Sequence, residues 1–195
     1  SNVDVTVSNN NPSATVNYYT LTMQTATNGT ATVNGTNVAN NGTVVLAGGT
    51  TTTANNYGHA IVGGGSSGYH FSSWTSVSGS PTIGSTSAAS TTVKVGAAST
   101  IKVTGAANTV TVNINKDGTA WSASGMKVTL YNGTTATSYT ATVSSGSAAS
   151  ISAVPNGTYN VYIGKDSNHK TDMVDSNVDV IVSNNNPSAT ANYYT

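Results

Sequence analysis

The sequence contains no cysteine, no arginine and no glutamate, and its charged residues are six lysines and six aspartates. Charged residues make up 6% of the chain and the formal net charge is zero, whereas about a quarter of the residues in soluble domains are charged. Without a basic cluster the chain lacks the electrostatic surface that nucleic-acid binding requires, which excludes a nucleic-acid partner. No apolar run reaches the roughly 18 residues of a membrane span and no charged-then-apolar leader is present, so we expect neither a membrane span nor a signal peptide in this segment.

The two ends of the chain carry nearly the same 20 residues. Residues 1–20 read SNVDVTVSNNNPSATVNYYT and residues 176–195 read SNVDVIVSNNNPSATANYYT, so 18 of 20 positions match at an offset of 175. The copies differ only at Thr6 and Ile181 and at Val16 and Ala191. Near-identity at this separation indicates recent duplication. We therefore interpret the chain as one period of a longer tandem-repeat array, together with a duplicated edge.

Alternation of apolar and polar residues recurs along the whole chain, and no segment shows convincing helical periodicity. The alternation predicts strands at 19–25, 43–47, 58–62, 69–74, 91–95, 99–104, 109–115, 126–131, 137–143, 148–153 and 158–163. It also predicts a hairpin over 178–194, repeated at the start of the chain. Short strands separated by turn residues predict an all-β fold of two small β-sandwich or β-grasp-like domains in tandem.

The composition changes at GAAN, residues 105–108, and together with the repeated ends this change predicts three parts. Residues 1–20 are the closing hairpin of the preceding repeat unit, residues 21–106 form a first domain, and residues 107–195 form a second. The segment NYYT at residues 17–20 runs directly into Leu21 without a flexible linker. We expect consecutive domains to be joined stiffly.

Asn-Gly-Thr occurs five times, and each occurrence has two readings. Asn-Gly is the preferred pair for a tight hairpin turn, and Asn-X-Thr is also a glycan acceptor in a host with the machinery. The two readings are compatible with each other. The asparagines concerned are Asn28, Asn34, Asn41, Asn132 and Asn156.

Residues 21–104 resemble the divergent internalin-type B-repeats of bacterial surface proteins, through NNGTVVLAGGTTTTA, GYHFSSWT, TTVKV and STIKVT. In such repeats the aromatic cluster of the GYHFSSWT segment plugs the core beneath a small sheet. The resemblance implies that Tyr69, Phe71 and Trp74 are core aromatics of this domain.

Residues 107–195 resemble the transthyretin-like, collagen-adhesin B-type domains that serve as stalk modules, through VTVNINKDGTAW, MKVTLYNG and AVPNGTYNVYIG. The resemblance implies that the Pro-Asn-Gly-Thr-Tyr turn leads into a core strand, with Tyr159 in the core. Many such domains carry a Lys-to-Asn isopeptide crosslink promoted by a buried Glu, and Lys116 and Asn192 occupy roughly the expected places. Because the chain has no Glu and no Asp in a middle strand, the proton transfer lacks its acid and we do not expect the crosslink.

Catalytic groups are scarce. The three histidines lie at 59, 70 and 169, with His59 in a loop-like stretch, and nothing pairs them with a nucleophile and an orienting acid. We therefore expect neither an enzyme nor a cofactor. Asp166, Asp172 and Asp175 lie in the one charge-dense stretch and are weak candidates for a divalent cation site, although they read more simply as a solvated loop.

A repetitive sequence that is rich in Thr, Ser and Asn and poor in charge is typical of secreted bacterial or archaeal surface proteins. We expect an extracellular structural repeat unit of a stalk or filament, with neighbouring repeat units as partners. Strand addition between chains through residues 1–20 or 176–195 is one form of that assembly. The alternative is an adhesin module in which exposed aromatics bind a glycan or a host protein, the candidates being Tyr57, Trp121, Tyr18 and Tyr19.

Overall fold

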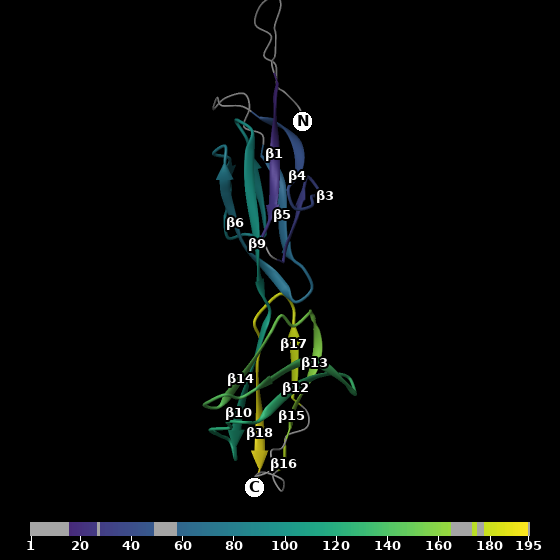
Figure 1. The fold of residues 1–195 in the computed structure, drawn as a ribbon, viewed down its shortest axis with the longest axis vertical. Coiled ribbons are helices and arrows are strands. Elements are labelled where there is room, and N and C mark those ends of the chain that lie inside the picture. The colour runs from purple at the N-terminus through teal and green to yellow at the C-terminus, as the bar shows by residue number, and fades with distance from the viewer. Residues whose placement is uncertain (1–15, 27, 49–57, 165–172, 175–177, 195) are drawn as a thin grey trace, which may run out of the picture. The chain divides into compact units, whose positions relative to one another are not determined.

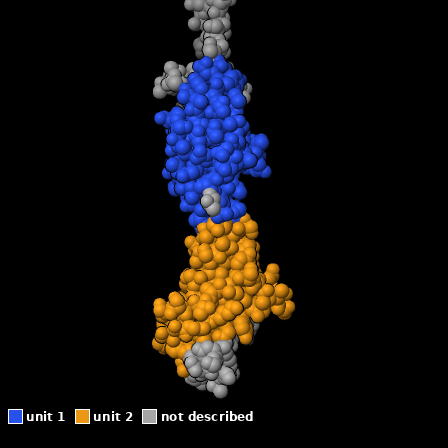
Figure 2. Space-filling view, viewed as in Figure 1, with its two compact units in different colours: residues 1–66, 70–106 blue, residues 67–69, 107–195 orange. Residues whose placement is uncertain are grey.

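The computed structural model describes residues 16–26, 28–48, 58–164, 173–174 and 178–194. The all-β prediction is confirmed, because the regular elements in these ranges are all strands (Figure 1). Within them no helix is long and apolar enough to cross a membrane. The chain divides into two compact units, which Figure 2 colours separately: unit 1 is residues 1–66 and 70–106, and unit 2 is residues 67–69 and 107–195.

Unit 1 contains two sheets. The first has the strand order β4 (Gly42–Gly48), β1 (Asn17–Thr25), β9 (Ser99–Ala107) and β6 (Tyr69–Ser78). The second has the order β3 (Thr36–Asn37), β2 (Gly29–Val33), β5 (His59–Gly65), β8 (Ser90–Lys94) and β7 (Thr82–Ile83). One face of each sheet contributes to a single core, which contains Leu21, Met23, Leu46, Trp74, Ile101 and Val103 from the first sheet and Ala31, Val33, Ile61 and Val93 from the second.

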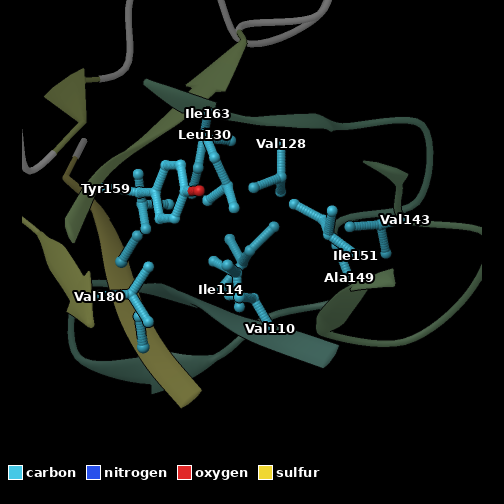
Figure 3. Close-up of a cluster of buried hydrophobic side chains, with 14 of the residues drawn as sticks. Val110, Ile114, Val128, Leu130, Val143, Ala149, Ile151, Tyr159, Ile163 and Val180 are labelled. Atoms are coloured by element: carbon cyan, nitrogen blue, oxygen red, sulfur yellow. The ribbon is translucent and has the colours of Figure 1, made fainter. Parts of the chain in front are cut away.

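Unit 2 is also a two-sheet sandwich. Its first sheet has the order β11 (Thr119–Ala120), β10 (Thr109–Lys116), β18 (Ser188–Tyr194) and β16 (Met173–Val174), and β14 (Ala148–Ser152) also pairs with β10. Its second sheet has the order β13 (Thr135–Thr142), β12 (Lys127–Asn132), β15 (Gly157–Gly164) and β17 (Asp179–Val182). Figure 3 shows side chains from both sheets meeting in the core between them.

The alternating sequence explains how these cores form. Along β15 the side chains of Tyr159, Val161 and Ile163 are buried, while the residues between them face outward. Successive side chains on a strand point to opposite faces, so three apolar residues at spacing two cover one face of the sheet. Burial of each such side chain contributes on the order of 1.5–3 kcal/mol.

In each unit the first and last strands are neighbours and run parallel. In unit 1, β1 pairs with β9 from Leu21↔Ser99 onward. In unit 2, β10 pairs with β18 from Thr111↔Ser188 onward. A chain whose first and last strands lie side by side and parallel enters at one end of the sheet and leaves at the other.

The prediction of a hairpin over 178–194 is wrong. β17 pairs antiparallel with β15 in one sheet, and β18 pairs with β10 in the other. The segment between them, residues 183–187, crosses from sheet to sheet. A hairpin and a crossover need the same two alternating strands and the same polar turn residues, so the sequence pattern could not distinguish them. The sequence reading also missed β2, whose short apolar run is enclosed by Asn-Gly pairs.

Candidate functional site

The candidate site is the duplicated strand, which appears in the structure as β18 in unit 2 and contributes to β1 in unit 1. In β18 the inward side chains are Ala189, Ala191 and Tyr193, all buried in the unit 2 core. Tyr194, the next residue, turns outward and is 43% exposed. This strand therefore ends on one buried and one exposed tyrosine.

Tyr193 has no solvent exposure and is among the largest fully buried side chains of the described residues. Its ring packs against Trp121, with ring centroids 5.7 Å apart and planes tilted by 59°. Its hydroxyl lies 3.4 Å from the Gly164 carbonyl oxygen, and the Lys116 ammonium lies 5.7 Å from the Trp121 ring centroid. Tyr193 was not predicted as a core aromatic, although its alternation with Ala189 and Ala191 indicates that it faces inward.

In unit 1 the two equivalent tyrosines have the opposite exposure. Tyr18, which corresponds to Tyr193, is 67% exposed. Tyr19, which corresponds to Tyr194, packs against the unit 1 core and faces the same way as the buried Leu21. A Cβ added to Gly48 would lie 2.0 Å from the Val95 carbonyl oxygen and 2.9 Å from the Tyr19 ring carbon Cδ2, so glycine at this position accommodates both groups.

Of the two differences between the copies, one falls within β18. Ala191 is fully buried, and the equivalent residue in the other copy is the larger Val16. Adding methyl groups to a closely packed core costs about 1–3 kcal/mol. The repeated segment at the start of the chain would therefore fit the β18 position of unit 2 less well than the segment at the end of the chain.

The predicted aromatic core of unit 1 is placed as follows. Trp74 is buried, and its indole Nε1–H donates to the Ala88 carbonyl oxygen at 3.1 Å. Phe71 packs against the core with its ring centroid 5.7 Å from that of Trp74. A Cβ on Gly63 would lie 2.5 Å from Phe71 Cδ2 and 2.9 Å from Trp74 Cζ2, so glycine there accommodates both rings. Tyr69 is half-buried and belongs to unit 2.

Tyr159 is buried in unit 2, beneath the turn that precedes its strand. Its hydroxyl donates to the Pro155 carbonyl oxygen at 3.1 Å. Its ring meets that of Tyr139 edge-on, with centroids 6.2 Å apart. Burial, with a smaller effect from Tyr139, raises the pKa of the Tyr159 phenol above its ordinary value of 10.0.

Three of the five Asn-Gly-Thr asparagines adopt the left-handed backbone conformation that Asn tolerates better than most residues. Asn28, Asn34 and Asn41 have φ of 66°, 48° and 60°. Asn34 and Gly35 form the two-residue loop between β2 and β3, which pair at Val33↔Thr36. This is the hairpin geometry that favours Asn-Gly.

The other two sites differ from each other. At Asn132 the positive φ falls on the following Gly133. At Asn156 the side chain is engaged, because its Nδ2 donates to Asn184 Oδ1 at 2.9 Å and its Oδ1 accepts from the Asn184 backbone N at 2.8 Å. A glycan on Asn156 would replace one of the two Nδ2 hydrogens, so the bond to Asn184 would have to be made by the one that remains. Glycosylation at the five sites stays a prediction.

A buried asparagine between β9 and β10 was not identified from the sequence. Asn108 is almost fully buried, and its Nδ2 donates to the Val154 carbonyl oxygen at 3.0 Å. The Val154 backbone N–H in turn donates to the Asn108 carbonyl oxygen at 3.1 Å. Because unpaired polar groups are costly inside a protein, these bonds fix the position where unit 2 begins.

His59 is not in a loop but is the first residue of β5, where it is buried. Its Nε2 lies 2.7 Å from the Ala47 carbonyl oxygen and its Nδ1 lies 3.3 Å from Asn34 Nδ2. An imidazole that donates from Nε2 and accepts at Nδ1 satisfies both contacts. The geometry gives His59 a structural position between strands.

The cation candidates Asp166, Asp172 and Asp175 lie outside the described residues. In the part of the chain that the structure describes, no group of three or more His or Asp side chains could hold a metal ion. Cation binding by the three aspartates stays a prediction.

Of the aromatic residues proposed as a binding platform, two pack within the separate units and one lies outside the described residues. Trp121 packs on Tyr193, Tyr19 packs on the unit 1 core, and Tyr57 lies outside the described residues. A different pair lies on the outer face of a unit 2 sheet: Tyr162, 54% exposed, has its ring centroid 5.6 Å from that of Tyr131.

No family model matches the sequence, and no curated protein matches it significantly. Among solved structures, the chain is similar to the Bacillus anthracis TIE protein, with a TM-score of 0.40 and 12% identity over 92% of this chain and 34% of that one. It is also similar to the major pilin protein (T-13) of Streptococcus pyogenes, with a TM-score of 0.30 and 9% identity over 91% and 95% of the two chains. This chain spans about a third of the Bacillus protein.

Proposed function

We propose that this chain is a structural repeat unit of an extracellular stalk or fibre, in which units follow one another end to end without catalysis. The observation that carries the proposal is the parallel pairing of the first and last strands in each unit. The near-identical 20-residue segments, 175 residues apart, supply the repetition.

The strand registers give the distance between entry and exit in each unit. In unit 1 the chain enters at Asn17 and leaves at Ala107, which lies eight residues beyond the Leu21↔Ser99 pair. At about 3.3 Å per residue this is a span of roughly 40 Å. The same reasoning gives roughly 26 Å for unit 2, from Thr109 to Tyr194. Each unit therefore advances the chain by a full strand length, as a stalk module must.

Strand exchange between chains is the less favoured form of assembly. The β18 position is occupied by the chain's own Ser188–Tyr194, and the other copy would bring Val16 into the space of Ala191. Covalent continuation from one unit to the next requires no such replacement. We therefore propose neighbouring repeat units of the same polypeptide as the main partners.

The test is to prepare chains of one, two and three periods, each added period consisting of residues 21–195. Small-angle X-ray scattering then measures the maximum dimension. If the units are stiffly joined, we expect a constant increment per period of at most about 65 Å, the sum of the two strand spans. An increment that shrinks with each period, as for domains joined by flexible linkers, would contradict the proposal.

A second candidate function is glycan binding, favoured by the contact between the exposed Tyr162 ring and the half-buried Tyr131 ring on one sheet face. Asn160 lies on β15, as Tyr162 does. Its Nδ2 donates to Asp179 Oδ1, which places polar groups beside the rings. Aromatic faces flanked by polar side chains suit sugar recognition. A glycan array in which a reproducible hit is lost with Tyr162→Ala would support this function, whereas the absence of any hit would count against it.

A further inference from the structure

The two adjacent tyrosines of the repeated NYYT segment serve different cores. In unit 2 the first tyrosine, Tyr193, is fully buried and the second, Tyr194, is 43% exposed. In unit 1 the first, Tyr18, is 67% exposed and the second, Tyr19, packs against the core. Each unit therefore packs into its core the tyrosine whose counterpart is exposed in the other unit.

We infer that one continuous strand joins unit 2 to a following copy of unit 1 and changes its buried face between the two tyrosines. This inference rests on the proposed function and names the docking surface within it. The strand first buries Ala189, Ala191 and Tyr193 in the unit 2 core. It then buries Tyr194, at the position of Tyr19, and the next copy's Leu21 and Met23 in the unit 1 core.

The change of face requires no bend in the strand. Adjacent side chains on a strand point to opposite sides, so residues at spacing two serve one core up to Tyr193 and residues from Tyr194 onward serve the other. The exposed side chain of Tyr194 is then covered by a second copy of unit 1. In that unit, Gly48 lies against both the Val95 carbonyl oxygen and the Tyr19 ring, and Leu46 pairs with Tyr19 across the two strands.

Backbone pairing sets one condition on the joint between unit 2 and the following copy of unit 1. Tyr193 and Tyr194 pair with β16, and Tyr193 also pairs with β10. The equivalent Tyr18 and Tyr19 pair with β4. A strand has only two edges, so the joint releases the end of one of these ladders over about two residues. Whichever ladder shortens, an extended strand still points Tyr193 and Tyr194 to opposite faces.

The test uses a two-period chain, residues 1–195 followed directly by residues 21–195, which recreates NYYTLTMQT at the joint. Amide hydrogen exchange is followed by mass spectrometry in the peptide ANYYTLTM. The first copy's peptide is VNYYTLTM, so the two are distinguished by mass. Tyr194→Ala is expected to accelerate exchange at the joint on the order of tenfold, and Tyr19→Ala is expected to have the same effect in the first copy.

Two controls accompany this measurement. Thr190→Ala replaces an exposed residue of the same strand and is expected to leave exchange at the joint unchanged. Tyr194→Ala in the single-period chain, where no second unit 1 follows, gives the baseline effect on unit 2. The inference is overturned if Tyr194→Ala has the same effect in both chains, or if Tyr19→Ala leaves its own peptide unchanged.

Scattering on the same two-period chain separates this inference from the proposed function. If the chain has the full two-period length and Tyr194→Ala does not affect the joint, the repeat-fibre proposal stands and the shared strand is refuted. If the chain is compact although Tyr194→Ala accelerates exchange, the shared strand stands and the end-to-end function is refuted.

Discussion

Replacing Tyr193 or its counterpart Tyr18 by alanine tests whether the repeated strand buries this tyrosine in unit 2 and exposes it in unit 1. Tyr193 and Tyr18 occupy the same position in two copies of NYYT, yet the first is fully buried and the second is 67% exposed. We expect Tyr193→Ala to destabilise unit 2 strongly and Tyr18→Ala to leave unit 1 almost unchanged.

The magnitude follows from the contacts of Tyr193. Removing a fully buried aromatic ring costs about 3–5 kcal/mol, and this figure includes the packing against Trp121. The hydroxyl contacts at 3.4 and 3.5 Å are too long to add much. We therefore expect a loss of about 4 kcal/mol, which lowers the urea midpoint of unit 2 by about 2 M. For Tyr18→Ala we expect a change within about 0.5 kcal/mol.

The positions of the two tryptophans provide the assay, because Trp74 lies in unit 1 and Trp121 in unit 2. In a Trp74→Phe background the fluorescence reports unit 2 alone, and in a Trp121→Phe background it reports unit 1 alone. Equal costs for the two tyrosine substitutions, or a cost below about 1 kcal/mol for Tyr193→Ala, would refute the assignment of buried and exposed roles.

Three further substitutions and one control, Gly164→Ala, test the two units. Gly63→Ala would force a methyl group against Phe71 and is expected to cost unit 1 about 2 kcal/mol by urea unfolding, whereas Gly164→Ala, whose Cβ would have 3.6 Å of clearance, is expected to be nearly neutral. Asn108→Ala leaves a buried carbonyl without its partner and should cost unit 2 about 2 kcal/mol, read from its fluorescence midpoint. Tyr159→Phe should cost about 1 kcal/mol at pH 7. Because the raised pKa of the Tyr159 phenol makes wild-type stability fall as pH rises above 10, the gap between wild type and Tyr159→Phe should narrow from pH 9 to pH 11.

Strand positions could be predicted where apolar residues alternate over five or more residues. The segments around β10 and β15 were located to within one or two residues, because Val110, Val112 and Ile114 and the similar series in β15 show the period directly. β2 offers only Ala31 and Val33 as buried side chains, and five residues between turns do not establish a period. The parallel pairing of first and last strands is a long-range property that alternation does not encode.

The candidate site shows the same division between local and long-range information. The repeat and the alternation of Ala189, Ala191 and Tyr193 were visible in the sequence, and they are sufficient to define a strand with one buried face. Which sheet β18 joins was not visible, because a hairpin and a sheet-to-sheet crossover need the same polar connection. The exposed partner of the Tyr131 ring could not be found either, because Tyr162 lies on a different strand and the pair depends on the register between β12 and β15.

The duplicated strand adds a constraint that neither unit shows alone. A tyrosine at the end of a strand normally needs only one explanation, either packing or exposure. Here the unit 2 core requires Tyr193. The core of a following unit 1 requires the next residue, because Tyr19 packs against the unit 1 core whereas its counterpart Tyr194 is exposed. Shifting the repeat by a single residue would place both side chains on the wrong faces. Inserting one alanine between Tyr194 and the next copy's Leu21 in the two-period chain should therefore destabilise the second unit 1 and leave unit 2 intact. An insertion that leaves the second unit 1 unchanged would show that the two cores do not share a strand.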